Sequence, residues 1–215
     1  MKVTKLGHCC LLIEEKGLRI LTDPGGYVDL DMVIKEAKDI DVILITHEHA
    51  DHIHVPSLKK LLENNPKAKV FTNKSVGKLV DDEDIKYEMV EDGQKFEVNG
   101  ILFEAIEGKH EVIYEGYGNV QNTGFFINDK LFYPGDSFKD PEKKVDILAL
   151  PVAGPWCKIS DAVDYALKVK PRVAFPVHDG MLRIKGGNHG VPSKFLPENG
   201  INFVIIEEGK SHEFN

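Results

Sequence analysis

Apolar residues occur along the chain in short runs, and polar or turn-forming residues separate each run from the next. Runs at 2–6, 9–15 and 18–22 predict three strands near the start, followed by a loop at 23–26. Residues 41–46 (DVILIT) form a continuous apolar run, which is typical of a strand covered on both faces. The pattern predicts further strands at 69–72, 86–90, 94–98, 101–106, 123–128 and 130–133.

Apolar positions at helical spacing predict three helices, at 31–38, 56–65 and 160–170. The second of these places three leucines on one face, and the third begins at a serine and an aspartate that can cap it. Strand-like runs surround and follow the third helix, at 146–152, 172–177 and 202–208.

Helices therefore alternate with strands at both ends of the sequence, and hairpin-like strands lie between them. This order favours an α/β fold in which two sheets pack together, with helices on their outer faces. The 215 residues contain no internal repeat and no linker-like segment. We therefore expect a single domain that spans 1–215.

The segment ITHEHADHIH (45–54) brings many polar groups together directly after a predicted buried strand. Imidazole and carboxylate groups bind zinc, iron and related cations, and a strand holds the loop that follows it rigidly. His47 and His49 are two positions apart and can turn to one cation, whereas Asp51 and His52 can face a second. A solvated turn would explain one or two such residues, but four at this spacing indicate a metal site.

The motif HxHxDH (47–52) after an apolar strand resembles the signature of the metallo-β-lactamase superfamily of metal-dependent hydrolases. Other segments match in the same order, so the resemblance spans nearly the whole chain. The segments GHCCLLIE (7–14) and LTDP (21–24) are similar to the opening of a branch related to L-ascorbate-6-phosphate lactonase. The resemblance implies an αββα sandwich of two mixed sheets, with metal ions at one rim.

The same resemblance implies seven metal ligands: His47, His49 and His110 at one cation, Asp51, His52 and His178 at the other, and Asp136 between them. In the sequence itself, Asp136, His178 and His110 each follow a strand-like run, so loops would present them at a common sheet edge. His189 and His8 are alternatives to His110 for the third position of the first site.

Three further polar residues have more than one plausible role. His8 is expected to orient a metal ligand or to face the substrate. Asp23 precedes a proline and can initiate a turn, but the family pattern favours a carboxylate that accepts the N–H of a metal-bound histidine. His54 is expected at the surface or behind a ligand.

Composition narrows the remaining possibilities. The chain is 42% apolar and 29% charged, as in an ordinary soluble globular protein. Its net charge is −8, from 27 basic and 35 acidic residues without a basic stripe, so nucleic acid is not an expected partner. The start lacks the features of a secretory signal and no membrane association is expected, which favours a cytoplasmic location. Cys9, Cys10 and Cys157 are expected to be reduced and buried.

We therefore expect a metal-dependent hydrolase that acts on a small molecule. Two divalent cations, zinc first and manganese or iron as alternatives, would share a water and supply a bound hydroxide. Asp51 would be catalytic, orienting the nucleophile or passing a proton to the leaving group. A small lactone or phosphate ester is the favoured substrate. The alternatives are a phosphodiesterase or nuclease with the same metal cage, or a non-hydrolytic metal-binding protein, and the sequence leaves the oligomeric state open.

Substrate contacts must come from short loops, because the chain has no long insertion. The candidate loops are 24–30, 111–122 and 153–159. Aromatic residues in them are candidates to line a pocket, although simple packing is their default role: Tyr114, Tyr117 and Trp156. Basic residues near the proposed ligands are candidates to bind an anion, although a solvated charge is their default role: Lys109, Lys158, Arg183 and Lys185.

Overall fold

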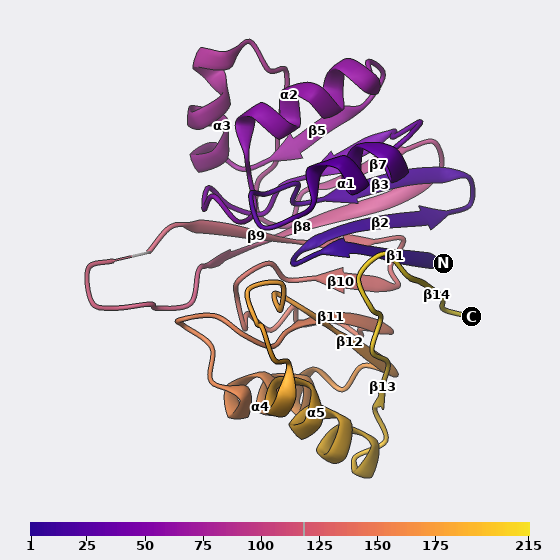
Figure 1. Ribbon diagram of the computed structural model, residues 1–215, viewed down its shortest axis with the longest axis vertical. Helices are drawn as coiled ribbons and strands as arrows, with labels where there is room; N and C mark the ends of the chain where they lie inside the picture. Colours follow the sequence, from indigo (N-terminus) through magenta and orange to yellow (C-terminus); the bar gives the residue numbers. More distant parts are fainter. Residues whose placement is uncertain (118) are drawn as a thin grey trace.

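The computed structural model describes residues 1–117 and 119–215. Two seven-stranded β-sheets pack face to face, and helices cover the outer face of each (Figure 1). This αββα arrangement confirms the predicted fold class. In the described part of the chain, no helix has the length and apolar character needed to cross a membrane.

The first sheet comes mainly from the N-terminal part of the chain. In spatial order it contains β14 (Ser211–Glu213), β1 (Lys2–Gly7), β2 (Cys10–Glu15), β3 (Leu18–Thr22), β4 (Val42–Leu44), β5 (Lys69–Thr72) and β6 (Glu88–Met89). The pairs from β14 to β3 are antiparallel, and those from β3 to β6 are parallel. β4 is buried along its whole length, as its continuous apolar run predicts.

The second sheet takes up the rest of the strands. In spatial order it contains β13 (Asn202–Phe203), β12 (Val173–Val177), β11 (Ile147–Pro151), β10 (Leu131–Tyr133), β9 (Gln121–Ile127), β8 (Ile101–Lys109) and β7 (Lys95–Val98). The pairs from β7 to β10 are antiparallel, and those from β10 to β13 are parallel. Both sheets are therefore mixed.

Each sheet has its own covering helices (Figure 1). The first sheet is covered by α1 (Leu30–Glu36), α2 (Val55–Asn64), α3 (Lys74–Val80) and a single 3₁₀ turn, η1 (Asp81–Glu83). The second sheet is covered by α4 (Ile159–Val169) and α5 (Gly186–Glu198). The side chains of Asp29 and Asn73 cap α1 and α3 by accepting hydrogen bonds from backbone N–H groups of the first turn.

Three apolar cores result from this layering. The central one lies between the two sheets and includes residues from both, among them Leu44, Phe103 and Phe175. The other two lie between each sheet and its helices. Each fully buried large apolar side chain stabilises the fold by roughly 1.5–3 kcal/mol relative to its exposed state. The cores fix the strand ends, and the strand ends position the site.

Some predicted elements differ from those observed. The chain at 186–198, expected to begin as a loop, forms α5, and α3 and β14 were not predicted. The late strand predicted at 202–208 is only two residues long, whereas β8 runs on to Lys109 and β9 starts already at Gln121. The long β8–β9 pair forms the base of the arm that projects in Figure 1.

Candidate metal centre

Four loops meet at one rim of the sandwich, and each follows the carboxyl end of a strand. They are the segment after β4, the end of β8, and the turns after β10 and β12. Because a strand fixes the start of the loop that follows it, side chains there are held rigidly. These loops bring together all seven predicted ligands: His47, His49, Asp51, His52, His110, Asp136 and His178.

Three imidazoles form the first group. The ligand nitrogens of His47, His49 and His110 lie within 4.8 Å of one another. The ring centroids of His47 and His49 are 4.8 Å apart, and those of His49 and His110 are 4.5 Å apart. Three imidazoles at this spacing are a suitable ligand set for a first-row divalent cation.

The second group contains Asp51, His52, Asp136 and His178, whose ligand atoms also lie within 4.8 Å of one another. Asp136 Oδ1 is 3.1 Å from His52 Nε2, and its Oδ2 is 2.8 Å from His178 Nε2. The same Oδ2 is 3.2 Å from Nε2 of His110, in the first group. Asp136 therefore lies between the two groups and faces both.

A tight turn and two side chains hold Asp136 in this position. Gly135 has a φ of +65°, and a Cβ there would come within 2.4 Å of the Asn122 side chain. Asn122 accepts a hydrogen bond from the Asp136 backbone N–H at 3.0 Å and donates one to the carbonyl of Pro134 at 2.8 Å. The Trp156 indole N–H donates to Asp136 Oδ2 at 3.1 Å.

Asp23 is a fully buried carboxylate behind the ligands. It accepts hydrogen bonds from His52 Nδ1 at 2.7 Å, from the Thr46 backbone N–H at 2.8 Å, and from the Thr46 hydroxyl at 2.7 Å. The Tyr133 hydroxyl is a fourth donor to it. Thr46 and Tyr133 were not predicted from the sequence, because no local pattern marks them.

The outer ring nitrogens of three ligands are fixed by hydrogen bonds. Nδ1 of His52 donates to Asp23, and Nδ1 of His47 lies 3.0 Å from the Thr46 hydroxyl. Nδ1 of His110 donates to the carbonyl oxygen of Glu111 at 2.5 Å. In a neutral ring, a proton on Nδ1 leaves the Nε2 lone pair free, so each ring presents an electron pair to the centre of the site when it is neutral.

The inner atoms of the site lack hydrogen-bond partners. Among the described residues, the buried atoms without a partner include Nε2 of His47, His52 and His110, both ring nitrogens of His178, and Oδ1 of Asp136. Burying so many unpaired polar atoms is costly unless other ligands satisfy them. Nitrogen and carboxylate donors converging on one space fit divalent cations, which would supply those partners.

Burial lowers the pKa values of His47 and His49, which keeps both imidazoles neutral and able to bind a cation.

Cys9 lies beside His8, His52 and His178 and offers a sulfur atom to the same space. Burial raises the pKa of the Cys9 thiol well above its usual value, so the sulfur stays protonated and is a poor ligand.

In the second group the histidine pKa values are raised, whereas those of His47 and His49 in the first group are lowered. Burial alone would lower the pKa of His178, but its contacts with Asp136 and Asp51 outweigh burial and raise the pKa to about 9. The pKa of His52 is raised above its usual value for the same reason, here by Asp136 and Asp23. Burial would raise the pKa of Asp136, but the neighbouring imidazoles hold it well below its usual range.

His8 lies behind Asp51 in the turn between β1 and β2. Its Nδ1 accepts the Gly180 backbone N–H at 3.2 Å, so Nε2 carries the ring proton and points to Asp51 Oδ2, 3.2 Å away. The His8 carbonyl accepts the His178 backbone N–H at 3.2 Å. A Cβ on Gly180 would lie 2.9 Å from His8 Cβ, so only glycine allows this close approach. His8 is thus positioned to orient Asp51, and that role stays a prediction.

His189 and His54 lie outside both ligand groups. His189, an alternative for the third ligand, is bonded through Nε2 to Asp179 at 2.7 Å. His54 is exposed and bonds through Nδ1 to the Ser57 hydroxyl at 2.7 Å, at the start of α2. His110, rather than His189, therefore completes the first group.

An ion-pair cluster supports the loop that carries His178. Asp179 is fully buried, and its Oδ1 lies 2.6 Å from Nζ of Lys5, which is 1% exposed. Lys185 approaches the other oxygen at 3.2 Å. Since Lys5 also donates to the carbonyl of Pro176 at 2.9 Å, the cluster ties β1 to β12 directly below the rim.

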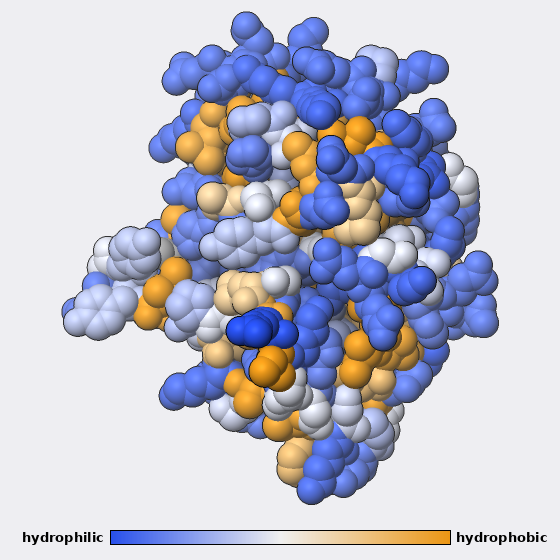
Figure 2. Space-filling model, viewed as in Figure 1, coloured by the Kyte–Doolittle hydropathy of each residue, from blue (hydrophilic) through white to orange (hydrophobic). Residues whose placement is uncertain are grey.

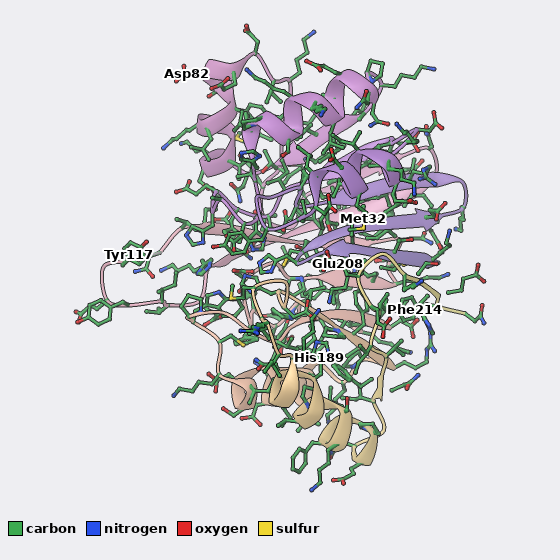
Figure 3. All side chains as sticks on the ribbon, viewed as in Figure 1. Met32, Asp82, Tyr117, His189, Glu208 and Phe214 are labelled. Atoms are coloured by element: carbon green, nitrogen blue, oxygen red, sulfur yellow. The ribbon has the colours of Figure 1, made fainter. Side chains whose placement is uncertain are left out.

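A cavity of about 420 Å³ opens above the two ligand groups. Its walls come from the loops after β3, β4, β8, β11 and β12, and include Tyr117 and Trp156, two of the three predicted aromatic residues. The third, Tyr114, is 74% exposed and does not line the cavity. Figure 3 places Tyr117 on the projecting arm, and His189 near the start of α5.

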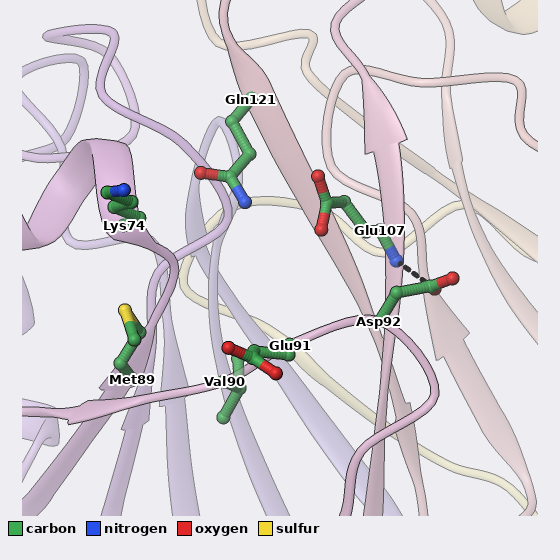
Figure 4. Close-up of a pocket in the computed structure, with 7 residues that line it drawn as sticks. All are labelled: Lys74, Met89, Val90, Glu91, Asp92, Glu107 and Gln121. Atoms are coloured by element: carbon green, nitrogen blue, oxygen red, sulfur yellow. Dashed lines mark hydrogen bonds between the residues drawn. The ribbon is translucent and has the colours of Figure 1, made fainter.

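A second hollow, of about 490 Å³, lies away from the metal centre (Figure 4). Lys74, Glu91, Glu107 and Gln121 line it, and Asp92 there accepts the Glu107 backbone N–H at 2.8 Å. The candidate metal-binding groups found among the described residues do not include these side chains. Among the described residues, the candidate metal-binding groups therefore lie at the rim and not in this hollow.

Comparison with known families agrees with this geometry. Residues 2–178 match the model of the beta-lactamase superfamily domain, a stretch that includes all seven ligands. The chain belongs to the metallo-β-lactamase superfamily. Within that superfamily it belongs to the UPF0173 family of metal-dependent hydrolases.

Sequence relatives support the UPF0173 assignment, and a solved structure shares the fold. The chain is 34% identical to a UPF0173 protein of Pyrococcus abyssi over 222 residues, covering 99% of this chain and 98% of the relative. It is 30% identical to a UPF0173 metal-dependent hydrolase of Thermoplasma acidophilum over 192 residues, or 83% of each chain. The fold is similar to that of Igni18, a metallo hydrolase of Ignicoccus hospitalis, with a TM-score of 0.78, 20% identity, and coverage of 100% and 99%.

Proposed function

We propose that this UPF0173 protein holds two divalent cations at the rim and hydrolyses a small lactone or phosphate ester. The observation that carries the proposal is the position of Asp136, whose two oxygens face both ligand groups at once. Zinc is the proposed metal, with manganese and iron as alternatives, because mixed imidazole and carboxylate donors accept all three. The similarity of the N-terminal segments to the ascorbate-6-phosphate lactonase branch supports the lactone.

The chemistry requires an electrophile held above Asp136 and a carboxylate beside it. Bound divalent cations would supply Lewis acidity and lower the pKa of coordinated water towards neutrality. Asp51 is 18% exposed and faces the cavity. Burial would raise its pKa, but the nearby imidazoles of His178, at 3.4 Å, and His8, at 3.2 Å, hold it well below the usual value, so Asp51 is ionised at neutral pH. As an ionised carboxylate it can accept a hydrogen bond from a nucleophile and so orient it, and passing a proton to the leaving group is the second role proposed for it.

Metal analysis and a substrate panel test this proposal. We expect about two equivalents of a divalent metal per chain, and turnover of a lactone or a phosphate ester that a chelator abolishes. Changing His49→Ala or Asp51→Ala should lower kcat/KM by about 100-fold or more, the range associated with loss of a general base or an electrostatic contact.

His54→Ala is the matched control, because it removes a neighbouring imidazole from the same ten-residue segment but outside both ligand groups. It should retain the metal content and turnover of the unchanged protein. Full turnover in the Asp51→Ala protein would refute its catalytic role. Bound oxidised iron without turnover of any ester would favour the non-hydrolytic alternative, and selective turnover of phosphodiesters would favour a phosphodiesterase.

A further inference from the structure

The cavity above the metal centre has uncharged walls. Its floor consists of the metal-ligand residues His49, Asp51, His110, Asp136 and His178. The other described residues that line it carry no charge: Tyr27, Ala50, Ile113, Tyr117, Pro155, Trp156 and Met181. A ligand that reaches the floor must therefore pass along aromatic and aliphatic surface.

The basic residues that the sequence offered as anion contacts lie elsewhere. Lys109, Lys158 and Arg183 are exposed, and none of them lines the cavity. Lys109 lines a neighbouring hollow together with Glu107, and that hollow shares only His110 with the cavity. Lys185 is paired with the buried carboxylate of Asp179. An anionic group held in the cavity, away from the cations, would thus lack a cationic partner among the described residues.

Large apolar side chains are unusually exposed at the mouth of this cavity. Tyr27, Tyr117 and Met181 line it and are 54%, 68% and 40% exposed. Val112 and Ile184, in the same two loops as Ile113 and Met181, are 60% and 80% exposed. Figure 2 shows pale and orange residues on the projecting arm at the left of the molecule. Apolar exposure concentrated at a pocket marks a binding surface rather than random surface composition.

We propose that the part of the substrate outside the metal centre is uncharged and largely apolar, as in a lactone or ester with an alkyl or aryl flank. The inference rests on the proposed function and narrows it. The cations would hold the reacting group, and the walls would bury the flank by removing apolar surface from water. A flank that carries a phosphate or carboxylate would instead be desolvated beside uncharged side chains and close to the Asp51 carboxylate, without compensation.

Two lactones of the same ring size test the preference. One carries a hexyl chain and the other a carboxylate-terminated chain of the same length, and the unsubstituted ring is the reference. We expect the hexyl chain to raise kcat/KM by about 10-fold or more over the unsubstituted ring, since several methylenes are buried. We expect the carboxylate-terminated lactone to react no faster than the reference. Hydrolysis of the anionic lactone as fast as, or faster than, that of the hexyl lactone would overturn the inference.

A charge placed in the wall should change the selectivity. Met181→Lys puts a cation where the structure has an aliphatic side chain at the cavity mouth. We expect it to raise the anionic-to-hexyl ratio of kcat/KM about 10-fold. Ile205→Lys is the control, because it makes the same charge change at another exposed aliphatic side chain, which does not line the cavity. An equal shift in both variants would show a general charge effect and refute a role for the wall.

Binding to Trp156 separates this inference from the hydrolysis itself. Trp156 is the single tryptophan of the chain, is 8% exposed, and lines the cavity. Unstrained lactams with the same hexyl or carboxylate-terminated chain keep the ring but resist hydrolysis. The hexyl lactam should change the tryptophan fluorescence at a concentration about 10-fold lower than the anionic lactam. If this holds while no lactone or ester is hydrolysed, only the proposed reaction fails. If the anionic lactam binds equally well, the apolar wall is not the determinant.

Discussion

Asp23 shows how much of the site depends on residues that would not contact a cation. It receives four hydrogen bonds and fixes the ring of His52, and its backbone has a positive φ of 35°. A non-glycine residue in that conformation persists only where its surroundings over-determine it. Four of the ligands were visible in the sequence because histidine and aspartate are spaced closely at 47–52. Thr46 and Tyr133 were not, because their roles arise only when β3, β4 and β10 come together.

Asp23→Asn should weaken metal binding by about 10- to 100-fold, as loss of the group that orients a ligand usually does. The amide places two N–H groups where the structure has an acceptor oxygen, so at least one donor from Thr46, His52 or Tyr133 loses its partner. We also expect the free energy of unfolding to fall by about 1–3 kcal/mol. Metal titration and thermal unfolding measure the two effects.

Asp29→Asn removes the same charge from the exposed cap of α1 and serves as the control. Asparagine caps helices about as well as aspartate, so stability and metal affinity should remain those of the unchanged protein. If the Asp23 variant binds metal as tightly as the Asp29 variant, the hydrogen bonds behind His52 do not contribute to affinity.

At the scale of elements, α5 shows where local pattern fails. Its sequence, GGNHGVPSKFLPE, contains three glycines and two prolines, which disfavour a helix. Tertiary contacts hold it in place: Leu196 is fully buried in the outer core, and Asn188 donates to the carbonyl of Val152 at 2.7 Å. His189 pairs with Asp179. Long, regular segments such as α2 and α4 were predictable because their apolar faces repeat at helical spacing.

The glycines of α5 leave room for stabilisation. A Cβ on Gly190 would meet no atom within 4 Å, and its φ is not positive. Gly190→Ala should therefore raise the free energy of unfolding by about 0.5–1 kcal/mol, because alanine loses less conformational entropy than glycine in a helix. Thermal unfolding should show a rise of about 2–4 °C per kcal/mol.

Gly180→Ala, ten residues earlier, is expected to lower the free energy of unfolding, in contrast to Gly190→Ala. A Cβ there would lie 2.9 Å from the buried His8 side chain, so this variant should be destabilised. A destabilised Gly190→Ala protein would mean that α5 needs glycine for a reason other than the space around it.

At the scale of the whole molecule, layer order and ligand positions were predictable, whereas the cavity was not. The alternation of strands and helices fixed the sandwich, and the resemblance placed the distant ligands His110, Asp136 and His178. The uncharged walls depend on which side chains five separate loops turn inwards. The orientation of these side chains follows from packing between segments far apart in the chain, which local sequence patterns do not indicate.

The raised pKa values in the second ligand group predict how the stability of the metal-free protein, prepared with a chelator, depends on pH. The folded pKa of His178 is about 9, above the ordinary value near 6.5, and that of His52 is also raised. A raised pKa stabilises the fold fully below the unfolded value, and that contribution is lost as pH rises through the folded value. After chelation, stability should therefore fall between about pH 6.5 and pH 9, as chemical denaturation at several pH values can measure.

Restoring zinc should remove this loss, because a bound cation requires neutral imidazoles and its affinity increases as they deprotonate. His178→Gln should likewise flatten the slope of the chelated protein. A chelated protein whose stability is constant or rises over this range would contradict the opposing charges assigned to the second group.

The ligands come from both sheets, and this has a kinetic consequence. His47, His49, Asp51 and His52 follow a strand of one sheet, whereas His110, Asp136 and His178 follow strands of the other. Because the cage needs residues from both layers, we expect it to form only after the layers dock, and a metal ion to bind late in folding. Interactions absent from the transition state slow unfolding without speeding folding. Bound metal should then lower the unfolding rate and so prolong the lifetime of the folded chain, leaving its folding rate unchanged.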